Sequence, residues 1–140
     1  MNPKLTAKGT AIEELIKTLH GAEVNGANAY YVLAAQAKSY GLEDLAEAML
    51  ANAAEDAFHG GKYGALLNPG AEGEAALWKR AVGFYQAEAG ARTKLLELAQ
   101  QVRDAGLPEI ADEIAATIPE EDEHARRLAK VFEAHGISYK

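Results

Sequence analysis

Residues 54–59 read AEDAFH, and residues 119–124 read PEEDEH. In both stretches an acidic residue stands three positions before a histidine: Asp56 before His59, and Glu121 before His124. Residues three apart lie on the same face of a helix, so each pair can direct a carboxylate and an imidazole toward one point. The two stretches therefore predict a helical unit that is present twice and that carries metal-ligand residue types.

The repeat extends along the chain at a constant offset of 65 residues, the difference between 121 and 56 and between 124 and 59. The same offset relates Glu23 to Glu88. Small and apolar residues keep this register without a gap, as in the pairs Leu33/Leu98, Gly41/Gly106, Leu42/Leu107, Ala46/Ala111 and Ala51/Ala116. Such a repeat predicts one helix pair duplicated about one shared site.

Composition restricts the class of protein. The chain has 140 residues, of which 49% are hydrophobic, with 4 Pro and 0 Cys, and this favours one all-α domain over residues 1–140. Without Cys there is no disulfide, no iron–sulfur centre and no thiol nucleophile. The net charge of −7 without a basic cluster argues against a nucleic-acid partner. No apolar run suits a signal segment or a membrane span, so we expect a cytoplasmic protein without a membrane partner.

Four helices in two hairpins are expected, which together form a four-helix bundle. Repeat 1 covers about residues 11–67 and repeat 2 about residues 74–134. The expected helices are 11–39, 43–67, 74–104 and 108–134.

Local residues set these boundaries. Thr10 and Glu13 have the spacing of a capping box at the start of the first helix. Asn68-Pro69-Gly70 is expected to end the second helix. Pro119 lacks a backbone N–H, so it is expected to kink the fourth helix.

Each expected helix carries an apolar seam in steps of three and four residues, and each seam is interrupted near its middle by ionisable residues. These residues are Glu23, Asp56, His59, Glu88, Glu121 and His124. Four carboxylates buried together repel one another, whereas two divalent cations would neutralise them. Oxygen and imidazole donors suit iron, with manganese or zinc as alternatives, so the sequence predicts two metal ions bound by these six residues.

Three more residues lie near these ligands along the sequence. His20 is one helical turn before Glu23, and Tyr30 and Tyr63 lie on the seams. We interpret all three as residues that support the site or pack the core, with His20 as an additional ligand as the alternative.

The ordered motifs resemble the rubrerythrin branch of the ferritin-like superfamily. Gly21-Ala22-Glu23 followed by Tyr30 is similar to the first-helix motif, and residues 54–59 are similar to the second-helix A-E-x-x-H region. Glu88 and residues 121–125, which read EDEHA, match the third-helix Glu and the fourth-helix E-x-x-H-A. The resemblance implies a ferritin-like bundle whose di-iron site reacts with hydrogen peroxide or oxygen in oxidative-stress defence.

The chain departs from that family at three points. Ala91 stands where rubrerythrins commonly carry an extra Glu, which implies weak peroxidase activity and a site closer to a bacterioferritin-type ferroxidase centre. Asp56 is one methylene shorter than Glu. The sequence has no Cys that could bind a rubredoxin-like iron, so we expect an external electron donor protein. Three functions stay open: a di-iron oxidoreductase, a ferroxidase or iron-handling protein, and a non-enzymatic bundle with a structural metal site.

The link between the hairpins is short for a ferritin-like bundle, in which the second and third helices run parallel. From the ligand level these two helices would leave a gap of about 38 Å, whereas residues 68–73 reach only about 25 Å. We therefore expect a homodimer formed by hairpin swapping, in which each site mixes Glu23, Asp56 and His59 of one chain with Glu88, Glu121 and His124 of the other. Unwinding at Gly60-Gly61 would lengthen the link and allow a monomer.

Overall fold

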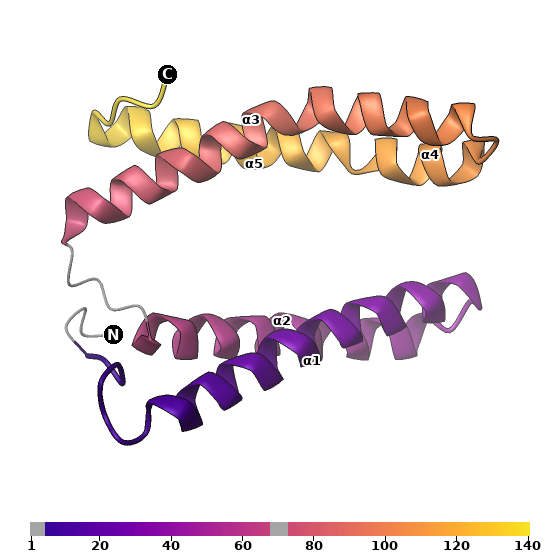
Figure 1. The fold of residues 1–140 in the computed structure, drawn as a ribbon. Helices are drawn as coiled ribbons and strands as arrows, with labels where there is room; N and C mark the ends of the chain where they lie inside the picture. Colours follow the sequence, from indigo (N-terminus) through magenta and orange to yellow (C-terminus); the bar gives the residue numbers. More distant parts are fainter. Residues whose placement is uncertain (1–4, 68–72) are drawn as a thin grey trace. The chain divides into compact units, whose positions relative to one another are not determined.

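The computed structural model describes residues 5–67 and 73–140, and all regular secondary structure in these ranges is helical. The chain forms two compact units that divide between the described residues 67 and 73, and each unit is one helical hairpin (Figure 1). The all-α class and the two hairpins agree with the sequence analysis. The expectation that residues 1–140 make a single domain stays a prediction.

The first hairpin consists of α1 (Glu13–Ser39) and α2 (Glu43–Leu67), which lie side by side (Figure 1). Gly41 lies in the turn between them with a φ of 72°, a left-handed conformation that glycine adopts without steric cost. The contact between the two helices is made by small residues. The buried ones are Ala27, Ala34, Ala37, Ala46, Ala53 and Gly60. Small side chains allow the two helix backbones to approach each other closely.

The start of α1 differs from the prediction. The helix begins at Glu13 rather than at residue 11, with Ile12 as its N-cap, and the capping box of Thr10 and Glu13 does not form. The Glu13 carboxylate accepts a hydrogen bond from the Gly9 N–H at 2.7 Å instead. The Thr10 side chain is directed toward Ala7, because its hydroxyl donates a hydrogen bond to the Ala7 carbonyl at 2.6 Å.

The segment before α1 is attached to the end of α2, and this explains the late helix start. The Ala7 N–H donates to the Leu66 carbonyl at 2.9 Å, and the Thr6 hydroxyl donates to the same oxygen at 3.1 Å. These bonds occupy a carbonyl in the last turn of α2, where no helical partner is available. A tertiary contact of this kind cannot be read from the local pattern at Thr10.

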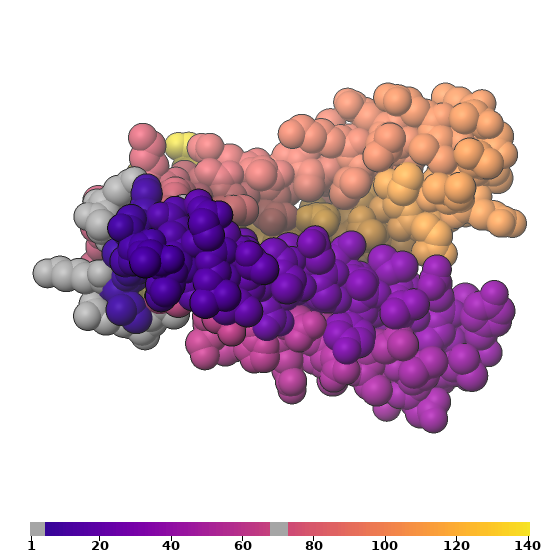
Figure 2. All heavy atoms as spheres, turned by 60° about the horizontal axis from the view of Figure 1, so that its bottom comes forward, coloured from indigo at the N-terminus to yellow at the C-terminus, as the bar shows by residue number. Residues whose placement is uncertain are grey.

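The second hairpin consists of α3 (Glu74–Asp104), α4 (Pro108–Ala116) and α5 (Ile118–His135). Both α4 and α5 pack against α3, and the space-filling view shows the orange atoms of α4 beside the adjoining end of α3 (Figure 2). The fourth expected helix is therefore interrupted at Thr117, which confirms the distortion expected from Pro119. Pro119 lies in the first turn of α5, where its missing N–H leaves no helical bond unmade.

Aromatic rings hold the open end of the second hairpin together. Phe132 on α5 is fully buried, and its ring lies 6.2 Å from that of Trp78 and 6.0 Å from that of Tyr85, both on α3. Tyr139 closes the cluster, 4.7 Å from Tyr85, and its hydroxyl donates to Glu133 at 2.7 Å. At the other end of the hairpin Arg103 forms an ion pair with Asp112.

The larger apolar residues of the predicted seams are not buried within the hairpins. Their exposed fractions are 44% for Leu33, 43% for Leu45, 68% for Phe84, 45% for Leu98, 51% for Ile110 and 44% for Val131. The sequence predicts that the apolar seams form the core of a four-helix bundle, and this stays a prediction, because neither hairpin buries these residues by itself. Two helices bury only the stripe along which they touch, and here alanine fills most of that stripe.

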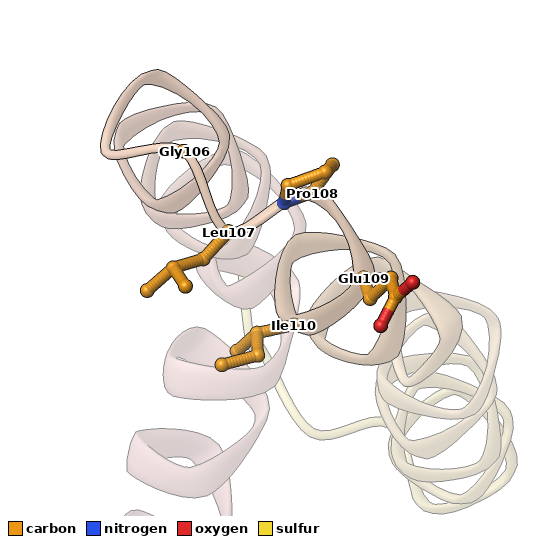
Figure 3. A pocket seen from close by; sticks show the side chains of 5 residues that line it. All are labelled: Gly106, Leu107, Pro108, Glu109 and Ile110. Carbon is orange, nitrogen blue, oxygen red and sulfur yellow. The ribbon is translucent and has the colours of Figure 1, made fainter.

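The tip of the second hairpin illustrates this exposure. Residues 106–110 border a hollow of about 320 Å³, in which Leu107 and Ile110 point to the same side and Glu109 points away (Figure 3). The matching residues of the first hairpin, Leu42 and Leu45, are 47% and 43% exposed. Both tips therefore present a pair of large apolar side chains.

The ends of the helices that flank the link agree with the prediction. Helix α2 is continuous through Gly60-Gly61 and ends at Leu67, and α3 starts at Glu74. The predicted stop at Asn68-Pro69-Gly70 lies outside the described residues. Among the described helices, none combines the length and the hydropathy that crossing a membrane requires.

Candidate metal centre

The first cluster of candidate ligands lies between α1 and α2. Glu23 comes from α1, and Asp56 and His59 come from α2. One donor atom from each of the three residues lies within 4.8 Å of the other two. His59 Nδ1 is 3.7 Å from a Glu23 carboxylate oxygen. The two acids are half-buried and the histidine is exposed.

The second cluster lies between α3 and α5 and repeats this arrangement. Glu88 comes from α3, and Glu121 and His124 come from α5, again with one donor atom from each within 4.8 Å of the others. His124 Nδ1 is 3.4 Å from a Glu88 oxygen and 3.5 Å from a Glu121 oxygen. The helix break at Thr117 precedes both α5 residues, so it does not separate them.

The two acids of the second cluster interact directly. A hydrogen bond with the Glu88 carboxyl raises the pKa of Glu121 above its ordinary value, and desolvation and the Glu88 charge raise it further. A shared proton is one way to relieve the repulsion between two neighbouring carboxylates. A cation in the same place is another, so the cluster has the electrostatics of a cation site.

The donor chemistry of both clusters fits a transition metal. Each cluster offers two carboxylates and one imidazole, the donor types that iron and manganese bind and that zinc also accepts. The structure therefore brings the six predicted residues together as two groups of three, one in each hairpin. Each group can bind one ion.

Two of the predicted supporting residues, His20 and Tyr63, lie near the first cluster. His20 lies outside both clusters, and its Nδ1 donates to the Gly60 carbonyl at 2.8 Å. It thereby ties α1 to the residue that follows His59. Tyr30 is half-buried. Tyr63 and His59 both border a hollow of about 210 Å³.

Sequence reasoning missed two features of these sites. The first is the ion pair between Arg92 on α3 and Asp122 on α5. The position of Asp122 next to Glu121 was the available signal. The second feature is the close approach of α1 and α2 at glycines of the first hairpin, of which Gly26 faces Asp56.

Residues 83–140 match the family model described as Rubrerythrin, and this segment contains Glu88, Glu121 and His124. No curated protein and no solved structure matches the chain. The match confirms the resemblance of the motifs on α3 and α5 and assigns this segment to the ferritin-like di-iron superfamily, whereas the resemblance of the motifs on α1 and α2 stays a prediction.

Proposed function

We propose that this rubrerythrin-like chain is a non-haem di-iron carboxylate protein, an oxidoreductase that reacts with hydrogen peroxide or oxygen in oxidative-stress defence. One observation carries the proposal: each hairpin gathers two carboxylates and one imidazole at the same position of the repeat. The rubrerythrin match over the second hairpin supports the choice of iron.

The two clusters are proposed to act as one centre. Each hairpin leaves the large apolar residues of its seams exposed, among them Leu33 on α1 and Leu98 on α3. Pairing of two hairpins would bury these residues, since apolar surface of this extent favours association. The ligand clusters lie at the middle of the same seams, so pairing would bring them face to face.

The chain's own residues would then hold and neutralise the metal pair. Glu23, Asp56, Glu88 and Glu121 carry about the negative charge that offsets two divalent cations. His59 and His124 would bind one ion each. A bound pair of ferrous ions would supply two electrons, which together with two protons would convert hydrogen peroxide into two waters. We propose that an external electron donor protein returns these electrons, since residues 1–140 contain no Cys to bind a second iron centre.

A homodimer formed by hairpin swapping is the proposed assembly. Helix α2 continues without a break from Asp56 to Leu67, and α3 runs from Glu74 to Glu88. If these helices are parallel, as in ferritin-like bundles, the gap between Leu67 and Glu74 is about 38 Å. The connecting residues reach only about 25 Å. A metal-loaded protein that stays monomeric at micromolar concentration would contradict the swap.

The second candidate is a ferroxidase or iron-handling protein. It is favoured by Ala91, which is half-buried one turn after Glu88 and offers no additional carboxylate. The fate of the metal separates the two functions, because an oxidoreductase keeps its iron through repeated cycles whereas an iron-handling protein releases it. A bundle with a structural metal site would show no reaction with either oxidant.

The decisive experiment is anaerobic loading with ferrous iron, followed by rapid mixing with peroxide or oxygen while absorption is recorded. We expect oxidation by either oxidant in the wild-type protein and its loss in Asp56→Asn and Glu121→Gln. The exposed neighbours offer matched controls, Glu55→Gln and Glu120→Gln, which should react like the wild type. Absence of a spectral change with both oxidants would overturn the proposed oxidoreductase.

A further inference from the structure

Three glycines in the first hairpin lie where its two helices approach most closely. A Cβ atom added at Gly26 would lie 3.0 Å from Asp56 Oδ2, and one added at Gly60 would lie 3.1 Å from Val24 Cγ2. A Cβ at Gly64 would lie 3.1 Å from the His20 ring. These separations are shorter than ordinary van der Waals contact, so the neighbouring groups occupy space that any other residue would fill.

The second hairpin has alanine at each of the three corresponding positions. Ala91, Ala125 and Ala129 stand 65 residues after Gly26, Gly60 and Gly64. The replacement is confined to glycines in contact. Gly21 and Gly61, where an added Cβ would meet no described atom within 4 Å, correspond to the longer residues Gln86 and Arg126. The contact glycines therefore mark positions where α1 and α2 leave no room for a Cβ atom.

The hairpins also differ in the length of one candidate ligand acid, and the shorter acid lies in the hairpin that has the contact glycines. The first hairpin has Asp56 opposite Gly26, and the second has Glu121 at the position that matches Asp56 and Ala91 at the position that matches Gly26. Both acids nevertheless have a donor atom within 4.8 Å of the other two ligands of their cluster. A shorter acid stays within this limit where its helix lies close to the opposite helix, and the Asp56 carboxylate lies against Gly26.

We propose that Gly26 is a positioning residue for the metal centre: its missing side chain makes the space in which the Asp56 carboxylate lies. This inference rests on the proposed function, in which Asp56 binds one of the two ions. It makes the two metal positions unequal, because one depends on a glycine contact and the other does not. A methyl group at position 26 would push the Asp56 carboxylate away from Glu23 and His59.

The test compares Gly26→Ala with Gly21→Ala in the full chain. Both glycines lie on α1, and both substitutions raise helix propensity, but only the first meets Asp56. Anaerobic titration with cobalt(II), followed by absorption and by equilibrium dialysis, measures the affinity for each ion without relying on activity. We expect Gly21→Ala to bind both ions as the wild type does. Gly26→Ala should lose about tenfold or more in affinity for one ion only.

Two further variants separate positioning from a general loss of structure. In Gly26→Ala/Asp56→Glu the additional methylene lets the carboxylate pass the new methyl group, so binding of the weakened ion should recover. Ala91→Gly, the change at the matching position of the second hairpin, should leave both affinities unchanged. Failure of the double variant to recover binding while its helix content is intact would overturn the proposal.

The outcomes distinguish this inference from the function on which it rests. If the wild-type protein binds no cobalt, the proposed metal centre fails, and the role of Gly26 fails with it. If the wild type binds two ions and the Gly26→Ala and Gly21→Ala variants bind them equally well, only the role of Gly26 is refuted.

Discussion

The two hairpins carry matching sets of candidate ligands, two carboxylates and one imidazole each, but are held together in different ways. In the first, α1 and α2 meet through alanine and glycine, with Gly60 placed against Val24. In the second, α3 and α5 are joined by the aromatic cluster around Phe132 and by the ion pair of Arg92 and Asp122. The register of the ligands is therefore independent of the packing that supports it.

The ion pair of Arg92 and Asp122 shows that different contacts hold the helices together in the two hairpins. The residues that correspond to Arg92 and Asp122 in the first hairpin are Ala27 and Ala57, of which Ala27 is buried. The charged pair beside the second cluster is thus replaced by two alanines in the first hairpin. The comparison teaches that close packing and long side chains are two ways to hold one ligand geometry.

Removal of Phe132 should have the largest effect on stability. Phe132→Ala empties the centre of the aromatic cluster, and a fully buried phenylalanine is expected to cost about 3–5 kcal/mol of unfolding free energy when truncated. Leu67, its counterpart in the first hairpin, is only half-buried, so Leu67→Ala should cost less. Urea unfolding followed by circular dichroism measures both. Equal losses would mean that the hairpins do not differ in the way described.

Gly60→Ala should destabilise the first hairpin, because the new methyl group would overlap Val24 and lie 3.5 Å from Glu23 Cβ. Gly61→Ala is the matched control, since it changes helix propensity equally and its Cβ meets no described atom within 4 Å. We expect the two variants to differ by about 1–3 kcal/mol in unfolding free energy, with Gly61→Ala the more stable. Equal stability of the two would contradict close packing at Gly60.

The smallest expected effect concerns the pH dependence of the second hairpin. The hydrogen bond to Glu133, followed by desolvation, raises the pKa of Tyr139 to about 12. Because the folded-state pKa is raised, this contact stabilises the fold below about pH 10, the ordinary value, and its contribution is lost as the pH rises through about 12.

Absorption of the phenolate during an alkaline titration tests this directly. Tyr139→Phe should remove the step near pH 12, and Glu133→Gln should move it to lower pH. If the step that Tyr139→Phe removes lies near the ordinary value of about 10, the contact with Glu133 does not persist in solution.

Glycine and proline residues near the helix ends made most helix boundaries predictable. The turns at Gly41 and Gly106, both with positive φ, end their helices where the sequence indicated, and Pro119 breaks the last helix as expected. The start of α1 was missed because the contacts of Thr6 and Ala7 with Leu66 are tertiary. Periodicity identified the apolar seams, but it does not tell which surface covers Leu33 or Phe84.

The candidate ligands were found from the sequence because their spacing repeats without a gap. The role proposed for Gly26 was not found from the sequence, because it depends on the distance between two helices. A pattern along one helix does not report that distance. The exchanges of Gly26 for Ala91 and of Asp56 for Glu121 between the repeats were its traces in the sequence. Positions at which the two repeats differ therefore contain structural information, as do positions at which they are identical.

The central claim is that the two clusters form one dinuclear centre. The most direct test is the iron content of the anaerobically loaded full chain, together with Mössbauer spectra recorded after oxidation. The account predicts about two iron ions per chain, whose ferric spins couple to a diamagnetic ground state because the ions share one site. Uncoupled ferric ions, a single ion per chain, or no bound iron would contradict it.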